Sequence, residues 1–143
     1  MKKVQTNVST RRPAQEVYEY LADFSNQAEW RFDVLESALV EGETGRVGAR
    51  YRQRVKQGRR ETEIKAELTQ ADAPRIVAFR TVDSGPVEVS GAWQISETGE
   101  GTHVVCDVAI EAKGFWKLFE PFMGPAMKRT AARYEQDLAQ HLG

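Results

Sequence analysis

Residues 34–111 alternate between apolar and polar side chains, and this pattern limits the possible folds more than any other feature of the chain. Alternation with a period of two places one row of side chains on each face of a β-strand. Short turn-forming stretches separate the alternating segments, at residues 42–45, 57–59, 72–74, 83–86 and 97–101. Because such breaks can close hairpins but are too short for helical crossovers, the sequence predicts six consecutive strands in an antiparallel meander.

A strand and two short helices are expected before this region. Lys3–Thr10 alternates and predicts a strand, and Pro13 suits the first position of a helix. Apolar residues then recur at helical spacing, at Val17, Tyr18, Leu21 and Ala22. Ser25 is expected to cap a second short helical turn that ends near Trp30.

The last stretch of the chain, Phe115 to Leu142, has the apolar periodicity of one long helix. Its apolar residues recur every three to four positions, at Phe119, Met123, Met127, Ala131, Tyr134, Leu138 and Leu142. Pro121 and Pro125 predict that the first turns are irregular or kinked. The expected fold class is therefore α+β, with an antiparallel seven-stranded sheet wrapped around the long C-terminal helix and two short helices after the first strand.

The hairpin of residues 47–68 sorts its side chains sharply between two faces. The inner face is expected to hold Val47, Ala49, Tyr51, Gln53 and Val55, then Thr62, Ile64, Ala66 and Leu68. The outer face alternates basic and acidic side chains. A turn with Gly58 at its first central position sets Lys56 opposite Glu61, whereas a Gln57-Gly58 turn sets Arg54 there. Both registers give the same faces, so the basic stripe is interpreted as a solvated face with cross-strand charge pairs.

The inner face as a whole is apolar with a few polar groups. The later strands add Val77, Phe79 and Thr81, then Val87, Val89, Gly91, Trp93 and Ile95, then Val104, Cys106, Val108 and Ile110. Because a twisted sheet wrapped around one helix rarely closes fully, a ligand cavity is expected there. Its candidate lining residues are Tyr51, Gln53, Thr62, Ile64, Phe79, Thr81, Trp93, Val108, Phe119, Met123 and Met127. The alternative is that the polar members are satisfied core groups and the methionines plain core.

Several kinds of site are not expected. His103 and Cys106 point to opposite faces of their strand, which argues against a metal site and against a Cys–His nucleophile pair. The central strands place no Asp, Glu, His or Lys on the inner face, so a catalytic acid or base would have to come from a loop or from the last helix. No catalytic residue, metal or cofactor is therefore predicted.

Composition restricts the partners and the compartment. The formal net charge of −1 argues against nucleic acid, and no apolar run approaches the length of a membrane span, so stable membrane insertion is not expected. The lone Cys106 and a polar N-terminal region without a signal-peptide core agree with a reducing cytoplasm. The protein is expected to be a monomer or a homodimer, and the sequence does not distinguish the two.

Several motifs carry a resemblance to a known superfamily. They are Val8–Tyr18 (VSTRRPAQEVY), Leu21–Asp23 with Asn26 and Trp30, Val47–Tyr51 (VGARY), Pro74–Arg80 (PRIVAFR), Gly101-Thr102 and Lys113–Phe115 (KGF). With the order of elements, they resemble the START-like superfamily, also called SRPBCC or Bet v 1-like, and within it bacterial polyketide cyclase/dehydrase-like proteins. The resemblance covers nearly the whole chain and implies a single domain over residues 1–143 with the helix-grip fold.

The resemblance also implies a class of function. Members of this superfamily are similar in having an apolar cavity under the C-terminal helix, which binds lipids, hormones, quinones or polyketides, and a minority are enzymes. The expected function is binding of a small hydrophobic or amphipathic ligand, such as a lipid, polyketide or quinone-like molecule. The alternatives are a polyketide cyclase/dehydratase-type enzyme acting on an aromatic or polyketide substrate, and an interaction protein whose cavity is vestigial.

Overall fold

The computed structural model describes all residues, 1–143. Strand β1 (Lys2–Thr10) is followed by helix α1 (Ala14–Ala22), the 3₁₀ helix η1 (Phe24–Asn26) and the short helix α2 (Gln27–Trp30). Six strands come next: β2 (Val34–Glu41), β3 (Arg50–Gln57), β4 (Arg60–Asp72), β5 (Ile76–Val82), β6 (Val87–Thr98) and β7 (Gly101–Ala112). A second 3₁₀ helix, η2 (Gly114–Phe119), leads into the long helix α3 (Glu120–Leu142).

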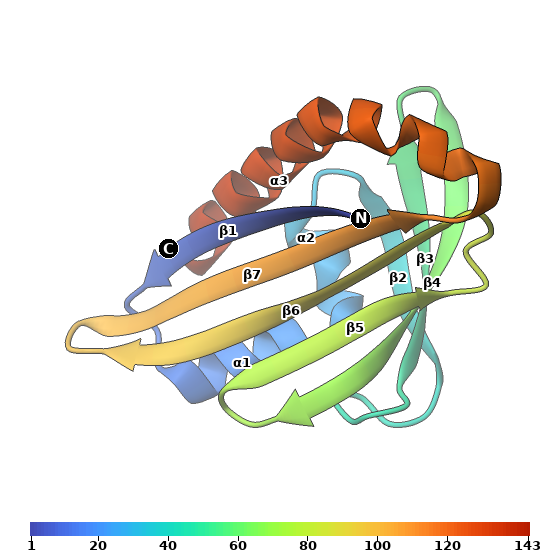
Figure 1. The fold of residues 1–143 in the computed structure, drawn as a ribbon. Coiled ribbons are helices and arrows are strands. Elements are labelled where there is room, and N and C mark those ends of the chain that lie inside the picture. Colours follow the sequence, from blue (N-terminus) through green and yellow to red (C-terminus); the bar gives the residue numbers. More distant parts are fainter.

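All seven strands form one antiparallel sheet in the order β1-β7-β6-β5-β4-β3-β2. Consecutive strands from β2 to β7 are neighbours, as hairpin-length connections require, and β1 adds to the edge beside β7. The sheet curves so that β2 and β3 turn away from β7, while α3 runs along β1 and α1 lies behind β5 and β6 (Figure 1). The predicted meander and the helix-grip fold are confirmed.

The β3–β4 hairpin adopts the first of the two registers considered. Lys56 pairs with Glu61 and Arg50 with Glu67, and Gly58 has the positive φ of 63° that its turn requires. The Arg54 side chain reaches diagonally to Glu61 at 3.2 Å and across to Glu36 at 3.3 Å. The basic stripe is therefore interleaved with glutamates, and the interpretation as a solvated, charge-paired face holds at Arg50 and Arg54.

A packed core fills one half of the space inside the curved sheet. The ring of Phe24, from η1, lies 5.5 Å from Tyr51, 5.4 Å from Phe79 and 5.5 Å from Trp93 between ring centres. Buried side chains of α1 close this half against the sheet, namely Ala14, Val17, Tyr18, Leu21 and Ala22. We call this region the packed half.

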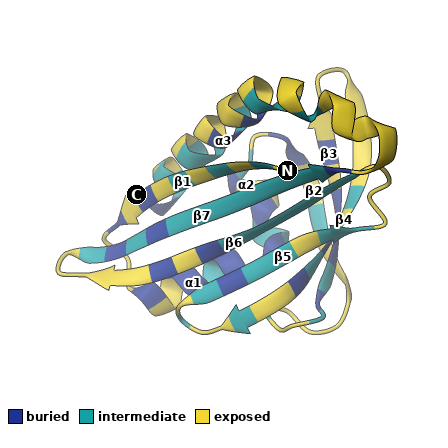
Figure 2. Cartoon of the chain, viewed as in Figure 1, coloured by how far each residue is buried: buried dark blue, intermediate teal, exposed yellow.

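Helix α3 is fixed at both of its ends. At the C-terminal end, the Leu142 carbonyl accepts hydrogen bonds from Arg12 Nε at 2.8 Å and Thr10 Oγ1 at 3.3 Å. At the other end, Glu120 accepts from the Ala112 backbone N–H at 2.9 Å and pairs with the N-terminal ammonium at 2.8 Å. Buried side chains of α3 begin only at Met127, and its first turns are mostly exposed (Figure 2). No helix is both long enough and apolar enough to cross a membrane.

Two local expectations were wrong. Asp23, not Ser25, caps the turn after α1, because its Oδ1 accepts from the Ser25 backbone N–H at 3.1 Å. Val47 is 63% exposed, since it lies in the loop before β3, where Gly48 with φ of 92° redirects the chain. The expected irregular start of the C-terminal helix is confirmed, because residues 115–119 are 3₁₀ and the regular helix begins at Glu120 with Pro121 in its first turn.

Candidate functional site

The inner face of the sheet is only half covered near the start of α3. Side chains there remain half-buried although they lie on the inner face of central strands. They are Ile64, Phe79, Thr81, Val89, Val108 and Ile110, with Val4 on β1 and Met123 on α3. Toward the other end of the same strands, the inward-facing Val77, Trp93 and Val104 are buried. Solvent therefore reaches a concave apolar surface, which we call the open half.

The open half is placed by the register of the strands. Val87 pairs with Ala112 and Gln57 with Arg60, so the β3–β4 turn, the β5–β6 loop and the end of β7 share one end of the sheet. The start of α3 and the β3–β4 hairpin both lie at this end in Figure 1. The opening thus lies between the first turns of α3 and the β3–β4 hairpin.

A polar cluster of Arg31, Asp33 and Tyr134 joins the α2–β2 connection to the middle of α3. Arg31 Nη2 donates to the Tyr134 hydroxyl oxygen at 2.7 Å, and that hydroxyl donates to Asp33 Oδ2. Arg31 Nε lies 3.3 Å from Asp33 Oδ1 as an ion pair, and the guanidinium carbon lies 4.5 Å from the centre of the Tyr134 ring. Arg31 Nε and Asp33 Oδ1 are buried and make no hydrogen bond, so they meet only each other, in this ion pair.

The cluster continues into the core through two glutamines. Arg31 Nη1 donates to Gln27 Oε1 at 2.9 Å, and Gln53 Nε2 donates to the same oxygen at 2.7 Å. Gln53 Nε2 also lies 3.2 Å from Ser37 Oγ, which donates to the Phe24 carbonyl at 2.6 Å. This network satisfies the two N–H donors of the Gln53 side chain without any ligand.

Burial governs the electrostatics of the cluster. Desolvation raises the pKa of Tyr134 to about 12; the Arg31 charge opposes the rise and Asp33 adds to it. The Tyr134 hydroxyl is therefore protonated at neutral pH. Desolvation, reinforced by Asp107, also raises the pKa of Cys106 to about 12, while the positive charge of Arg31 lowers it. Because Cys106 faces inward on β7, Arg31 acts electrostatically across the interior of the molecule.

The structure divides the eleven predicted lining residues into three groups. Five share the open half, namely Ile64, Phe79, Thr81, Val108 and Met123, and Thr62 lies at its exposed rim. Four others are buried: Tyr51, Gln53, Trp93 and Met127. Phe119 is 45% exposed and packs on Phe115 and Trp116, outside the open half.

The polar residues of the predicted set have different surroundings. Thr81 Oγ1 accepts from the Val89 backbone N–H at 3.0 Å, so it bridges β5 and β6 where their backbone pairing has ended. Burial raises the pKa of Tyr51. The Tyr51 hydroxyl is buried and has no hydrogen-bond partner.

Sequence reasoning missed the cluster itself. Tyr134 was counted only as a member of the apolar helical stripe, and Arg31 and Asp33 fall in a break between predicted elements. The available signal was an Arg-Phe-Asp turn placed directly between a short helix and a strand. The structure brings Asp33, from the α2–β2 connection, and Tyr134, from α3, within hydrogen-bond distance of each other.

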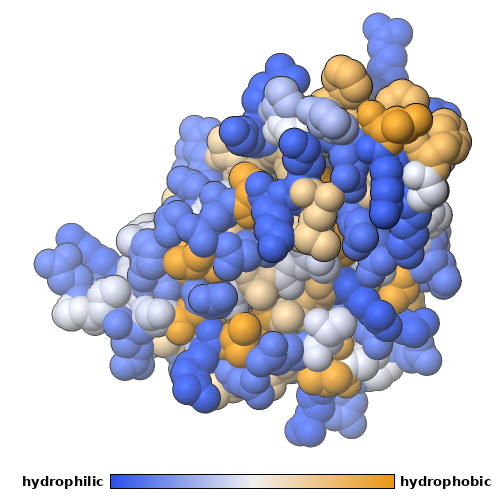
Figure 3. Space-filling model, viewed as in Figure 1, coloured by the Kyte–Doolittle hydropathy of each residue, from blue (hydrophilic) through white to orange (hydrophobic).

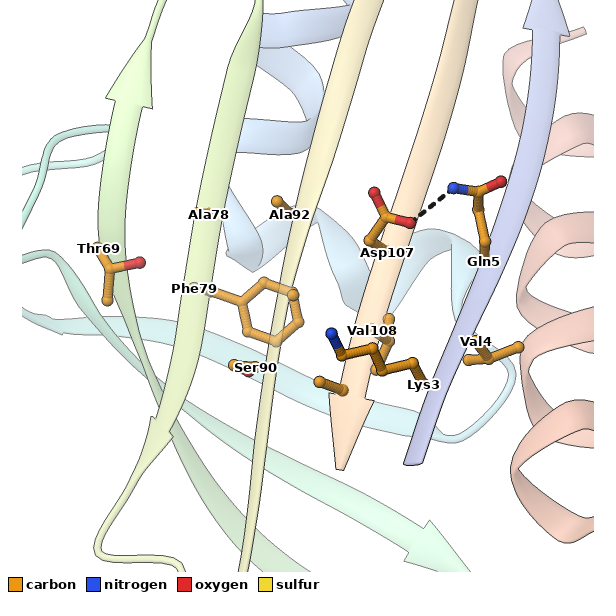
Figure 4. Close-up of a pocket in the computed structure, with 12 residues that line it drawn as sticks. Lys3, Val4, Gln5, Thr69, Ala78, Phe79, Ser90, Ala92, Asp107 and Val108 are labelled. Carbon is orange, nitrogen blue, oxygen red and sulfur yellow. Dashed lines mark hydrogen bonds between the residues drawn. The ribbon is translucent and has the colours of Figure 1, made fainter. Parts of the chain in front are cut away.

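A second hollow, of about 570 Å³, lies on the outer face of β1 and β4–β7. Small side chains are among those that line it, namely Ala78, Ser90, Ala92 and Ala109. At its rim Gln5 Nε2 donates to Asp107 Oδ1 at 2.8 Å, with Lys3 nearby (Figure 4). This hollow is an open depression, and its amide and carboxylate already bond to each other.

Candidate metal and nucleophile groups do not come together. No set of three or more His, Cys, Asp or Glu side chains is arranged to hold a metal ion. The ring nitrogens of His103 contact Ser9 Oγ at 3.0 Å and Asn7 Oδ1 at 3.1 Å on the outer face, whereas Cys106 faces inward. The predicted opposition of these two side chains is confirmed.

Known structures share this architecture. A START superfamily protein from Mycobacterium smegmatis is 12% identical with a TM-score of 0.81, covering 98% of this chain and 96% of that one. The Zhui aromatase/cyclase from Streptomyces sp. R1128 is 17% identical with a TM-score of 0.76, covering 99% and 93%. The ginseng major latex-like protein 151 from Panax ginseng is 15% identical with a TM-score of 0.75, covering 99% and 97%. At these identities the likeness establishes the fold alone.

Sequence comparison gives the family. None of the curated proteins matches this chain. The family model described as polyketide cyclase / dehydrase and lipid transport matches residues 1–143. Together with the helix-grip fold, this match over the whole chain shows that the protein belongs to the polyketide cyclase/dehydrase and lipid transport family.

Proposed function

We propose that the protein binds a small, mostly apolar molecule with one polar end in the open half of its concave face. The observation that carries the proposal is the row of half-buried apolar side chains there, including Ile64, Phe79 and Val108, whereas Val77, Trp93 and Val104 toward the other end of the same strands are buried. A ligand that covered these side chains would gain about 25 cal/mol for each Å² of apolar surface removed from water. The family description supports a polyketide or lipid ligand.

The polar cluster supplies the chemistry for the polar end of the ligand. Arg31 carries a positive charge that is paired with Asp33 at 3.3 Å, and the Tyr134 hydroxyl, protonated at neutral pH, donates to the same carboxylate. A carbonyl, phenol or carboxylate oxygen of a ligand would take the place of Asp33 as the acceptor for these two groups. An apolar body with such an oxygen is common to quinones, polyketides and fatty acids.

Fluorescence of anilinonaphthalene sulfonate, an apolar probe with one anionic end, tests this proposal. The wild type should bind the probe, and Val108→Phe should weaken binding by at least about tenfold, or about 1.4 kcal/mol. The matched control is Val105→Phe, which places the same ring on the outer face of the same strand and should leave binding unchanged. Equal binding by the wild type and by both variants would place the probe elsewhere and refute the proposal.

A second pair of variants guards against misfolding. Thr62 is exposed at the rim of the open half, so Thr62→Trp narrows the opening without entering the packed core. Glu63→Trp adds the same ring to the outer face of β4. Loss of probe binding in Thr62→Trp but not in Glu63→Trp would support the proposed site, and the opposite result would contradict it.

A cyclase or dehydratase acting on an aromatic or polyketide substrate is the second candidate function. The hydrogen bond from Tyr134 to Asp33 favours it, because a phenol held protonated beside a carboxylate can donate to an enolate oxygen. In the free protein, however, the phenol proton is engaged by Asp33, which favours binding over catalysis. The discriminating assay is turnover of a poly-β-ketone analogue. An enzyme should lose turnover in Tyr134→Phe while still binding the probe, whereas a carrier should show no turnover in either form.

A further inference from the structure

Five large apolar side chains are exposed together where β7 leads into α3. They are Phe115, Trp116, Leu118, Phe119 and Phe122, with exposures of 66%, 42%, 73%, 45% and 78%. We call this group the aromatic cap. In Figure 3 apolar side chains gather at the upper right, where η2 and the start of α3 lie in Figure 1. A contiguous exposed apolar patch of this kind marks an interaction surface.

The aromatic cap is built into the fold. The rings of Phe115, Trp116 and Phe119 pack on one another with centres 5.1–6.1 Å apart. Before the cap, the Lys113 backbone N–H donates to the Pro86 carbonyl at 2.7 Å, and after it Glu120 is held by Ala112 and the N-terminus. Both ends of the cap are therefore tied to the sheet, and its apolar face is presented in a defined orientation.

Basic side chains flank the aromatic cap along the chain. Residues 111–129 contain Lys113, Lys117, Lys128 and Arg129 and two acidic residues, Glu111 and Glu120. Glu120 is neutralised by the N-terminal ammonium at 2.8 Å, and only Lys113 has an acidic partner, Glu88 at 3.2 Å. This segment is thus positively charged, although the whole chain has a formal net charge of −1.

We propose that the aromatic cap docks the protein on the surface of an anionic lipid bilayer. Phe, Trp and Leu side chains that project from a short amphipathic segment enter the boundary between headgroups and acyl chains, and flanking lysines contact anionic headgroups. The uncompensated positive charge around the cap is what favours a bilayer over an apolar groove on another protein. Because the cap lies at the same end of the sheet as the open half, docking would also turn that opening toward the bilayer. The proposal depends on this surface alone, so the vesicle experiment can refute it without refuting the proposed ligand binding.

Vesicle flotation tests the docking. The wild type should float with vesicles of equal parts phosphatidylcholine and phosphatidylglycerol. It should bind vesicles of pure phosphatidylcholine at least about tenfold more weakly, and molar salt should have a similar effect. The double variant Leu118→Ser/Phe122→Ser should also lower partitioning by at least about tenfold, because it removes the two most exposed apolar side chains. Lys117→Glu should weaken binding to the anionic vesicles only.

The control variant is Val40→Ser/Val47→Ser. It removes two apolar side chains that are 52% and 63% exposed but lie on β2 and the following loop, so vesicle binding should stay unchanged. All these positions are exposed, so folding should be preserved, and circular dichroism checks this. A blue shift of Trp116 emission on anionic vesicles would support the proposal.

Three results would overturn the proposal. The first is that the wild type floats with neither kind of vesicle, and the second is that the control variant loses binding as strongly as the cap variant. The third is a dimer in sedimentation equilibrium that Leu118→Ser/Phe122→Ser dissociates, which would assign the cap to a second copy of the chain.

Discussion

The position of the Phe79 ring depends on the absence of a side chain at Gly91. A Cβ atom built at this position would lie 2.8 Å from Phe79 Cε1 and 2.9 Å from the Asp107 carbonyl oxygen. Phe79 is the direct cross-strand partner of Gly91, so the ring occupies the space that a side chain would need. The glycine thus lets Phe79 reach Phe24 and Trp93, and this contact couples the packed half to the open half.

Gly91→Ala should therefore destabilise the protein by about 1–3 kcal/mol through overpacking. The control is Gly99→Ala, because a Cβ there meets no atom within 4 Å and its backbone does not have a positive φ. Chemical denaturation followed by circular dichroism measures both variants. If Gly91→Ala proved as stable as Gly99→Ala, Phe79 would have another position available and the packing argument would fail.

At the scale of elements, α3 combines two different halves. Its second half buries Met127, Ala131, Leu138 and Leu142, and its last carbonyl is held by Arg12 and Thr10. Its first half contains Gly124 and Pro125, which disfavour a helix interior, and it lies over the open half with little buried surface.

Hydrogen exchange should separate the two halves of α3. Backbone amides of residues 122–127 should exchange faster than those of residues 131–142, because opening the first half breaks few buried contacts. Saturating the protein with anilinonaphthalene sulfonate should slow amide exchange in the first half of α3, because the bound probe would cover Met123. Uniform protection along α3 in the free protein would contradict this description of the helix.

At the scale of the whole molecule, the four tyrosines share one electrostatic property. Burial raises the pKa of Tyr18 and of Tyr51, and it raises those of Tyr20 and Tyr134 to about 12 from an ordinary value of 10. Glu29 adds to the rise at Tyr20. The folded protein therefore holds these phenol protons more tightly than the unfolded chain does.

The free energy of unfolding should consequently fall as the pH rises from about 10 toward 12. Below pH 10 both states keep their phenol protons and the stabilisation is complete; above it the unfolded chain loses its protons first. Ultraviolet absorbance of phenolate should show native tyrosines titrating later than those of the chain unfolded in guanidinium. Tyr134→Phe should make the free energy of unfolding fall less steeply over this pH range. If the tyrosines of the native and the unfolded protein titrated at the same pH, the raised pKa values would be refuted.

The sequence alone determined the order of the elements and the two faces of the sheet. Alternation, turn residues and helical spacing are local properties, so they predicted the meander, the charged outer face of the β3–β4 hairpin and the inward rows of β5–β7. They also predicted which residues could line a site, and five of them, Ile64, Phe79, Thr81, Val108 and Met123, do share the open half.

Only the tertiary structure decided how far the concave face is filled. Tyr51 and Trp93 have the same facing as Val108, yet Phe24 and α1 pack over the first two and leave the third accessible. The polar cluster likewise joins Arg31 and Asp33 to Tyr134, more than 100 residues away along the chain. Periodicity reports which way a side chain points, but what covers it depends on elements distant in sequence, and those contacts exist only once the sheet has curved around α3.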